Sequence, residues 1–170
     1  SVELWNEIHA IPEVDYATIH IWPYNWSWVS PDAITDSVDV AIANTDAYIA
    51  EHHRSLAAAL AGPDGRGKSK PIVLEEFGYP RDGMAIAPGS AVSGRDRYYS
   101  YIFDEVAGKG RLAGVNFWAW GGYAAPAHET WRRGDDYTGD PAQEAQGLNS
   151  VFAADSTTLA VIRKGVSKLH

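Results

Sequence analysis

Two adjacent acidic residues, Glu75 and Glu76, directly follow the apolar run formed by residues 71–74. Carboxylates act as nucleophiles, or as general acids and bases, in many hydrolytic enzymes. The run before them is rich in β-branched residues, which is typical of a parallel strand buried on both faces. Because successive side chains of a strand point to opposite faces, the sequence predicts that only one of the two acids faces a site.

Aromatic residues are frequent, with seven Trp and nine Tyr. Most of the Trp residues lie in two short segments, residues 22–28 and 118–131. Aromatic rings bind sugars because the C–H groups of a sugar pack on the ring face while its hydroxyls form hydrogen bonds, although such rings also fill protein cores. Since Trp is mostly buried in proteins, sugar binding and core packing stay equally open for each single ring.

Three other residues near these groups are candidates for a site. His20 lies one residue from the end of the β-rich run 16–21, beside the first aromatic segment. A lone His is often a satisfied core residue, but this position favours a role beside the carboxylates. Arg81 and Asp82 follow the acidic pair, where they either contact sugar hydroxyls or pair with each other at the surface.

The alternation of β and α patterns predicts a parallel sheet. Strands are expected at residues 16–21, 71–77 and 112–120, and right-handed crossovers place their carboxyl ends at one edge of the sheet. Functional groups follow all three strands, and this coincidence is hard to explain by packing alone. The groups are His20 and Trp22, Glu75 and Glu76, and Trp118 and Trp120.

Four helices connect and follow these strands. The first is expected to end near Ala10, because Pro12 cannot continue it. Apolar residues at helical spacing, with Ser30 as N-cap and Pro31 at the first helical position, predict a long helix over residues 31–60. The others are predicted over residues 95–110 and after a cap at Asp155 or Ser156; residues 62–70 read as a turn-rich connection, and residues 121–150 lack regular periodicity.

Composition limits the classes of partner. The 170 residues are 45% hydrophobic, as expected of one globular domain, and the formal net charge of −8 disfavours nucleic acid. The absence of Cys excludes disulfides and thiolate metal sites, and no apolar run is long enough to predict a membrane span. The spacing of Asp135, Asp136 and Asp140 does not follow a calcium-binding loop, so we interpret them as turn formers. No metal or cofactor is expected.

Three segments carry a resemblance to a known family. The segment KPIVLEEFGYP resembles the seventh strand of family 5 glycoside hydrolases, in which the Glu of an E-F-G motif is the nucleophile; this position is Glu76. TIHIWPYNW resembles the sixth strand of the mannanase branch at His20, Trp22, Pro23 and Trp26. GVNFWAWGG resembles the eighth strand, whose Trp, here Trp118, floors the subsite of the attacked sugar. Residues 136–157 also resemble bacterial mannanase-like members, so the likeness covers nearly the whole chain.

The resemblance implies an α/β fold, the C-terminal part of a (β/α)₈ barrel with three βα units. Residues 1–170 would then be a partial catalytic domain, because a full barrel takes about 250 residues. An N-terminal companion chain or segment is expected, either after cleavage in the loop behind the fifth strand or as a separate polypeptide. Self-association of fragments is the less favoured alternative.

Two features depart from the family pattern. Many relatives have a Tyr at the position of Trp22, and an indole N–H donates a hydrogen bond without acid–base capacity, so the tuning of the nucleophile is open. The family's general acid belongs to an Asn-Glu pair at the end of the fourth strand. The Asn-Glu pair of this chain, Asn6-Glu7, lies in a predicted helix before the first strand, and we interpret Glu7 as a surface residue.

The implied activity is retaining hydrolysis of β-1,4-mannosidic bonds in mannan or glucomannan. Alternatives are a cellulase-like or exo-β-mannosidase member of the same family, or a non-catalytic carbohydrate-binding module. A secreted or periplasmic location is expected from the substrate class. The expected catalytic residues are Glu76 and His20, and the expected substrate-binding residues are Trp22, Trp26, Trp118, Trp120 and Arg81.

Overall fold

A parallel sheet of three strands forms the centre of the structure. The computed structural model describes residues 1–61 and 69–169, so most of the predicted connection at residues 62–70 lies outside the described residues. The strands are β1 (Ala17–Ile21), β2 (Ile72–Phe77) and β3 (Gly114–Phe117), and they lie in the order β1-β2-β3. Both pairings are parallel, which confirms the predicted topology.

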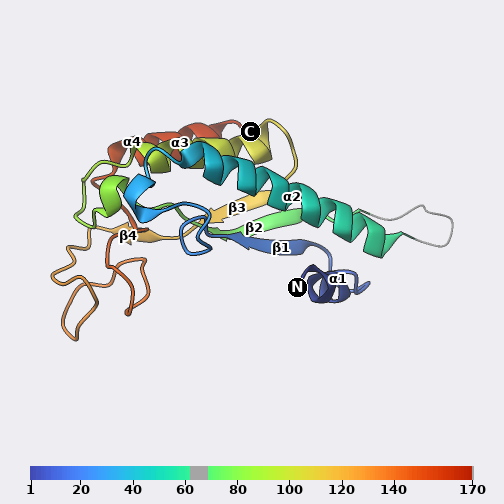
Figure 1. The fold of residues 1–170 in the computed structure, drawn as a ribbon, viewed down its shortest axis with the longest axis horizontal. Coiled ribbons are helices and arrows are strands. Elements are labelled where there is room, and N and C mark those ends of the chain that lie inside the picture. The colour runs from blue at the N-terminus through green and yellow to red at the C-terminus, as the bar shows by residue number, and fades with distance from the viewer. Residues whose placement is uncertain (62–68, 170) are drawn as a thin grey trace.

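Three helices lie along one side of this sheet (Figure 1). They are α2 (Val38–Leu60), α3 (Ser93–Ala107) and α4 (Ser156–Ser167), whereas α1 (Val2–His9) lies near the start of β1. Apolar residues of α2 and α3 form one buried core with the side chains that the strands direct toward them. Within the part of the chain that the structure describes, none of the helices has the length and apolarity needed to cross a membrane.

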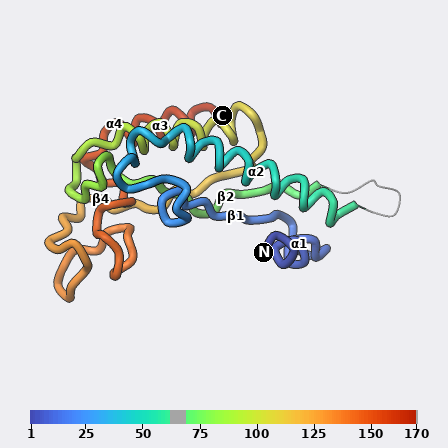
Figure 2. Tube along the Cα trace, viewed as in Figure 1, coloured from blue at the N-terminus to red at the C-terminus, as the bar shows by residue number. Residues whose placement is uncertain are grey.

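The loops that follow the strands gather at the end of the sheet away from α1 (Figure 2). They contain two short 3₁₀ helices, η1 (Pro31–Ala33) and η2 (Asp82–Met84). They also contain a second pair of parallel strands, β4 (Trp120–Gly122) and β5 (Val151–Phe152). The predicted third strand therefore bends after Phe117 and continues as β4, which pairs with a segment close to the C-terminal helix.

The long helix begins later than the sequence predicts. Ser30 does act as a cap, because its hydroxyl accepts a hydrogen bond from the backbone N–H of Asp32, but it caps only η1. The regular helix α2 starts at Val38. Ile34 is buried, and its carbonyl accepts a hydrogen bond from the hydroxyl of Tyr79 at 2.7 Å. This contact from a distant segment holds the chain in a turn where local pattern favours a helix.

The sheet is covered on only one face by the described residues. Ile72 and Leu74 of β2 face the helices and are fully buried, whereas Val73 on the opposite face is half-buried. On that same face Thr18 is half-buried and Asn116 is exposed. The prediction that β2 is buried on both faces is therefore wrong for this chain, because all the covering helices pack on one side. The open face is continuous with the carboxyl ends of the strands.

Close packing of α3 and α4 predicts a test of the fold. A Cβ atom at Gly165 would lie 2.3 Å from Cγ of Phe103, which is far closer than van der Waals contact. Replacing Gly by Ala in a helix normally stabilises it by about 1 kcal/mol. We expect Gly165→Ala instead to lower the free energy of unfolding, by about 1–3 kcal/mol, because overpacking outweighs propensity. In Gly114→Ala, the control, the nearest contact is 3.9 Å. Urea unfolding that finds Gly165→Ala more stable than the parent would contradict this packing.

Candidate active site

An extra residue in β2 determines the directions in which the side chains of Glu75 and Glu76 point. Ile19 pairs with Leu74, but the next residue of β1, His20, pairs with Glu76. On the other side, Leu74 pairs with Val115 and Phe77 with Phe117, so β2 has one residue more than β3 over this stretch. Such a β-bulge turns two successive side chains toward the same partner. The predicted orientation of Glu75 and Glu76 toward opposite faces is therefore wrong.

Both carboxylates approach the imidazole of His20. Nδ1 of His20 lies 2.9 Å from Oε2 of Glu76, and Nε2 lies 3.9 Å from Oε2 of Glu75. The side chain of Glu76 is 25% exposed, whereas that of Glu75 is 41% exposed. Glu76 is thus the more sheltered acid and has the closer contact with the ring. The side chain also keeps part of its surface exposed, and a nucleophilic carboxylate must be reachable by its substrate.

Trp22 and Trp118 lie next to the end of β2. A Cβ atom at Gly78 would meet Cζ3 of the Trp22 ring at 2.5 Å and the carbonyl oxygen of Trp118 at 3.3 Å. Glycine at this position therefore lets the Trp22 indole approach the backbone just after Glu76. The backbone N–H of Trp118 donates to the carbonyl of Phe77 at 2.8 Å, which keeps Trp118 beside β2. The Trp118 side chain is partly exposed, as a platform for a ligand requires.

The other two Trp candidates occupy different surroundings. The ring of Trp26 packs against Trp28 at a centroid distance of 5.0 Å and against Tyr48 of α2 at 5.3 Å. Trp26 thus shares an aromatic cluster with the outer helix while staying partly exposed. Trp120 belongs to β4 and is 53% exposed. The substrate-binding roles of both remain predictions.

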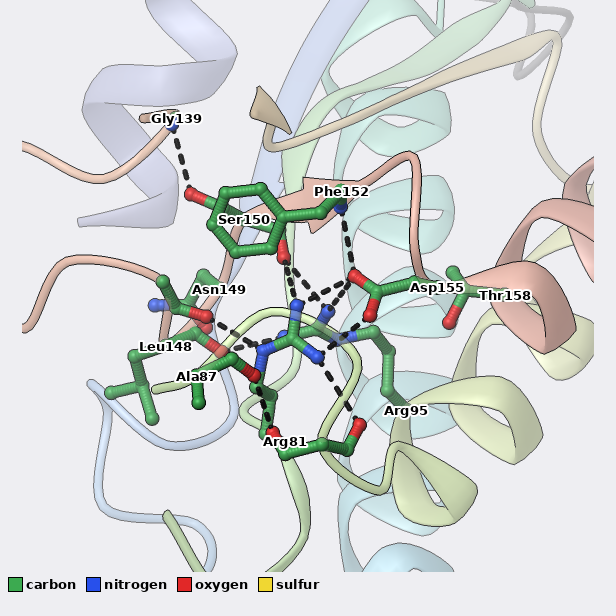
Figure 3. A network of polar contacts seen from close by, with 12 residues as sticks. Arg81, Ala87, Arg95, Gly139, Leu148, Asn149, Ser150, Phe152, Asp155 and Thr158 are labelled. Atoms are coloured by element: carbon green, nitrogen blue, oxygen red, sulfur yellow. Dashed lines mark hydrogen bonds and ion pairs between the residues drawn. The ribbon is translucent and has the colours of Figure 1, made fainter. Parts of the chain in front are cut away.

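Arg81 does not belong to the ligand surface. It is completely buried, and its two terminal nitrogens donate to both carboxylate oxygens of Asp155 at 2.8 and 2.6 Å (Figure 3). Burial raises the pKa of Asp155, but the hydrogen bonds from Arg81 and from the backbone of Phe152 outweigh this and lower it overall. The predicted contact of Arg81 with substrate is wrong, because its guanidinium group is saturated by interior partners.

Asp82 caps a helix instead of pairing with Arg81. Its carboxylate accepts hydrogen bonds from the backbone N–H groups of Ser93 and Gly94, at 2.8 and 2.9 Å, and from the Ser93 hydroxyl. Burial acts to raise the pKa of Asp82, but these hydrogen bonds at the start of α3 lower it overall. Neither Arg81 nor Asp82 is therefore left free to bind a ligand.

The structure adds a wall to the site that the sequence did not reveal. Residues 140–150, the wall segment, contribute Glu144 and Asn149 to a cavity of about 260 Å³ that Tyr24 and Asn25 line from the loop after β1. The pKa of Glu144 is raised by burial, by Asp140 and by the charge of Glu76. Oδ1 of Asn149 is buried and has no hydrogen-bond partner in the structure. The cavity is therefore lined by polar side chains, Asn25, Glu144 and Asn149, beside an acceptor that has no partner.

A buried acid, Asp140, binds the backbone N–H groups of the wall segment. The carboxylate of Asp140 accepts hydrogen bonds from the backbone N–H groups of Gly147, Asn149 and Ser150, and from the Ser150 hydroxyl. Asp135 likewise accepts from His128 and from the backbone of Arg132. Both act in loops as the sequence predicts. Among residues 1–61 and 69–169, no group of three or more His, Cys, Asp or Glu side chains is arranged to hold a metal.

The Asn6-Glu7 pair lies away from these groups. Both residues belong to α1, where the Asn6 side chain donates to the hydroxyl of Ser55 at 2.6 Å and Glu7 is exposed. Since α1 lies before β1, this pair does not follow a strand end. The interpretation of Glu7 as a surface residue is confirmed.

Comparisons with known proteins point in one direction. The family described as "GH family 5 beta-mannosidase-like" matches residues 1–170. A protein of Oryza sativa subsp. japonica named mannan endo-1,4-β-mannosidase 9 is 32% identical over 128 residues, which are 73% of this chain and 26% of that protein.

Solved structures agree in fold. The family 5 mannosidase of Rhizomucor miehei superimposes with a TM-score of 0.80 and 26% identity, over 99% of this chain and 41% of that one. The endo-β-1,4-mannanase of Thermotoga petrophila gives a TM-score of 0.54 at 23% identity, over 96% of this chain and 28% of that one. The α/β fold, as part of a (β/α)₈ barrel, is thereby confirmed, and the chain spans less than half of each of these relatives.

The effect of the Glu76 charge on Glu144 predicts a coupling between their ionisations. Because the charge of Glu76 helps to raise the pKa of Glu144, we expect Glu76→Gln to lower the pKa of Glu144, so that Glu144 ionises at a lower pH. A carbon-13 NMR titration of the Glu144 carboxyl would measure the change. Glu75→Gln is the matched control, since Glu75 is not among the groups that raise this pKa. An unaltered Glu144 midpoint in Glu76→Gln would refute the placement of the wall segment.

Proposed function

The chain belongs to the β-mannosidase-like group of glycoside hydrolase family 5, and from this premise we propose that it is part of an enzyme that hydrolyses β-mannosidic bonds with retention. Glu76 is the proposed nucleophile. The observation that carries this assignment is the sheltered Glu76 carboxylate, 2.9 Å from His20 at a strand end and beside Trp22 and Trp118.

Retention requires two carboxyl groups about 5 to 5.5 Å apart, one to attack the anomeric carbon and one to protonate the departing oxygen. In the first step an oxygen of Glu76 forms a bond to the anomeric carbon while the acid gives its proton to the leaving group. In the second step the general acid, now a carboxylate, takes a proton from water. The oxygen of that water then bonds to the anomeric carbon, which releases the sugar and restores Glu76. His20 holds the Glu76 carboxylate in position through both steps.

The general acid is proposed to come from an N-terminal companion, either a chain or a segment. The three parallel strands match part of a barrel, and the chain spans 41% of the Rhizomucor miehei mannosidase. A companion that adds the remaining strands would cover the open face at Val73 and Asn116. It would also place a strand end, with its acid, opposite Glu76.

A mannoside substrate is proposed from the relatives and from the site. A variant of the Rhizomucor miehei enzyme was solved in complex with mannosyl-fructose, and the Oryza sativa relative is named for mannan. In this chain Trp118 supports stacking on a sugar ring, while Glu144 and Asn149 support hydrogen bonds from its hydroxyls. A polymeric mannan cannot enter a cell, so a secreted or periplasmic location belongs to the same proposal.

Covalent trapping tests the nucleophile. A 2-deoxy-2-fluoro-β-mannosyl fluoride carries a leaving group that departs without protonation, so labelling does not depend on the general acid. We expect the mass of the chain to rise by one fluorosugar, with the label mapped to Glu76 by peptide sequencing, and we expect no label on Glu76→Gln. The matched control, Glu75→Gln, should still be labelled.

Either of two results would overturn this assignment. A label on Glu75 would move the nucleophile by one residue. Binding of manno-oligosaccharides with no label on either acid, both alone and with the barrel completed by a companion, would favour a non-catalytic carbohydrate-binding module.

A further inference from the structure

Two fully buried arginines hold the backbone of the wall segment. Arg81 donates from Nε to the carbonyl of Gly147 at 2.9 Å and from Nη2 to that of Ser150 at 3.1 Å. Arg95 donates from Nη1 to the carbonyl of Ser150 at 2.9 Å and from Nη2 to that of Leu148 at 2.6 Å. Figure 3 shows the two guanidinium groups close together, near Leu148, Ser150 and Asp155. The backbone from Gly147 to Ser150 is thus bound on its carbonyl side by positive charge.

Asp155 balances this charge and links the arginines to α4. Its carboxylate pairs with both terminal nitrogens of Arg81, and Nη1 of Arg95 lies 3.7 Å from it. All three side chains are fully buried. A buried ion pair adds little net stability compared with apolar residues of similar volume, because desolvation offsets the attraction. The benefit of this arrangement therefore lies in the geometry that it imposes.

That geometry connects the wall segment to the strand that carries Glu76. Arg81 lies on the buried continuation of β2, and its backbone N–H also donates to the carbonyl of Leu148 at 3.2 Å. Nε of Arg95 donates to the carbonyl of Tyr79 in the same continuation at 2.8 Å. The arginines bind the wall segment on one side and belong to or bind the continuation of β2 on the other. Displacement of the wall segment from Glu76 therefore breaks several charged hydrogen bonds at once.

Asn149 lies in the middle of the backbone stretch that the two arginines bind. The carbonyls on either side of it, of Leu148 and Ser150, bind the arginines, while its own N–H donates to Asp140 at 2.9 Å. Asn149 lines the cavity, and its buried Oδ1 has no hydrogen-bond partner in the structure. A buried acceptor left unsatisfied is unfavourable, and a ligand hydroxyl that reaches it would remove that penalty.

We infer that Arg81, Arg95 and Asp155 form a positioning cluster, which touches no ligand but fixes the Asn149 acceptor relative to Glu76. The cluster thereby sets the affinity of the cavity for the hydroxyls of a mannoside. This inference rests on the proposed function for the identity of the sugar.

The test compares Arg81→Lys with Arg111→Lys in the full chain. Lys keeps the charge at position 81, but its single ammonium group cannot replace the planar guanidinium that binds both Asp155 oxygens and two carbonyls of the wall segment. Arg111 pairs with Glu105 and Asp46 at the far end of α3, so its substitution breaks another ion-pair network without touching the wall segment. Isothermal titration with mannobiose and mannotriose gives the affinity, and hydrogen exchange gives the protection of the amides of residues 147–150.

We expect both variants to lower the melting temperature, but only Arg81→Lys to weaken mannobiose binding, by roughly ten-fold, and to speed exchange at residues 147–150. Should Arg81→Lys fail to fold, Arg95→Lys takes its place, because it loses the Leu148 and Ser150 carbonyls while leaving the Arg81–Asp155 pair. Asn149→Ala should weaken mannobiose binding without a change in the exchange of residues 147–150, since the positioning cluster stays intact.

The outcomes separate this inference from the function on which it rests. Unchanged affinity or unchanged exchange in Arg81→Lys, with the parent binding mannobiose, would overturn the positioning cluster alone. Equal loss of affinity in Arg111→Lys would also overturn it, because the effect would then be one of general stability. Lack of mannobiose and mannotriose binding by the parent, with or without a completed barrel, would overturn the mannoside assignment as well.

Discussion

Between Leu74 and Phe77, β2 contains one residue more than the strands on either side of it. Without that residue, strict alternation would send one of the two acids into the apolar layer beneath the helices, where a charge without a partner is strongly unfavourable. With it, both carboxylates reach the open face, and His20 lies between them. Phe77 then resumes the alternation and returns to the core. The bulge thus allows a pair of acids to end a strand that is otherwise apolar.

The segment after the bulge extends this constraint to the rest of the site. Gly78 leaves room for the Trp22 ring, and Tyr79 reaches across to the carbonyl of Ile34. Arg81 then binds the wall segment and Asp155. A single stretch of chain therefore carries the proposed nucleophile and contacts two surrounding segments, the connection between β1 and α2 and the wall segment. A change in the register of β2 would displace all of them together, which is why the bulge and the buried arginines belong to one structural unit.

Local pattern was sufficient for the features that depend on neighbouring residues. The three parallel strands, the end of α1 near Ala10, and the meeting of His20, Glu76 and Trp118 at one edge were predictable from periodicity and from the parallel topology. The errors came from contacts between distant residues. The partner of Arg81 lies 74 residues away, and the start of α2 is shifted by Tyr79 from another element.

Glu144 and Asn149 could not be found from the sequence, because they lie in an aperiodic stretch whose shape is set by Asp140 and the arginines.

The charges of the site favour a neutral ligand with many hydroxyls. Glu75 and Glu76 lie near one imidazole, and the charge of Glu76 also acts on Glu144, so an anionic substrate would meet repulsion, while a sugar hydroxyl can donate a hydrogen bond to a carboxylate oxygen. Burial, Asp140 and the charge of Glu76 together raise the pKa of Glu144. A sugar hydroxyl that reaches Asn149 supplies a hydrogen-bond donor to a segment in which the Asn149 Oδ1 has no partner. A neutral sugar, the proposed ligand, adds no negative charge beside Glu76 and brings hydroxyl donors to these acceptors.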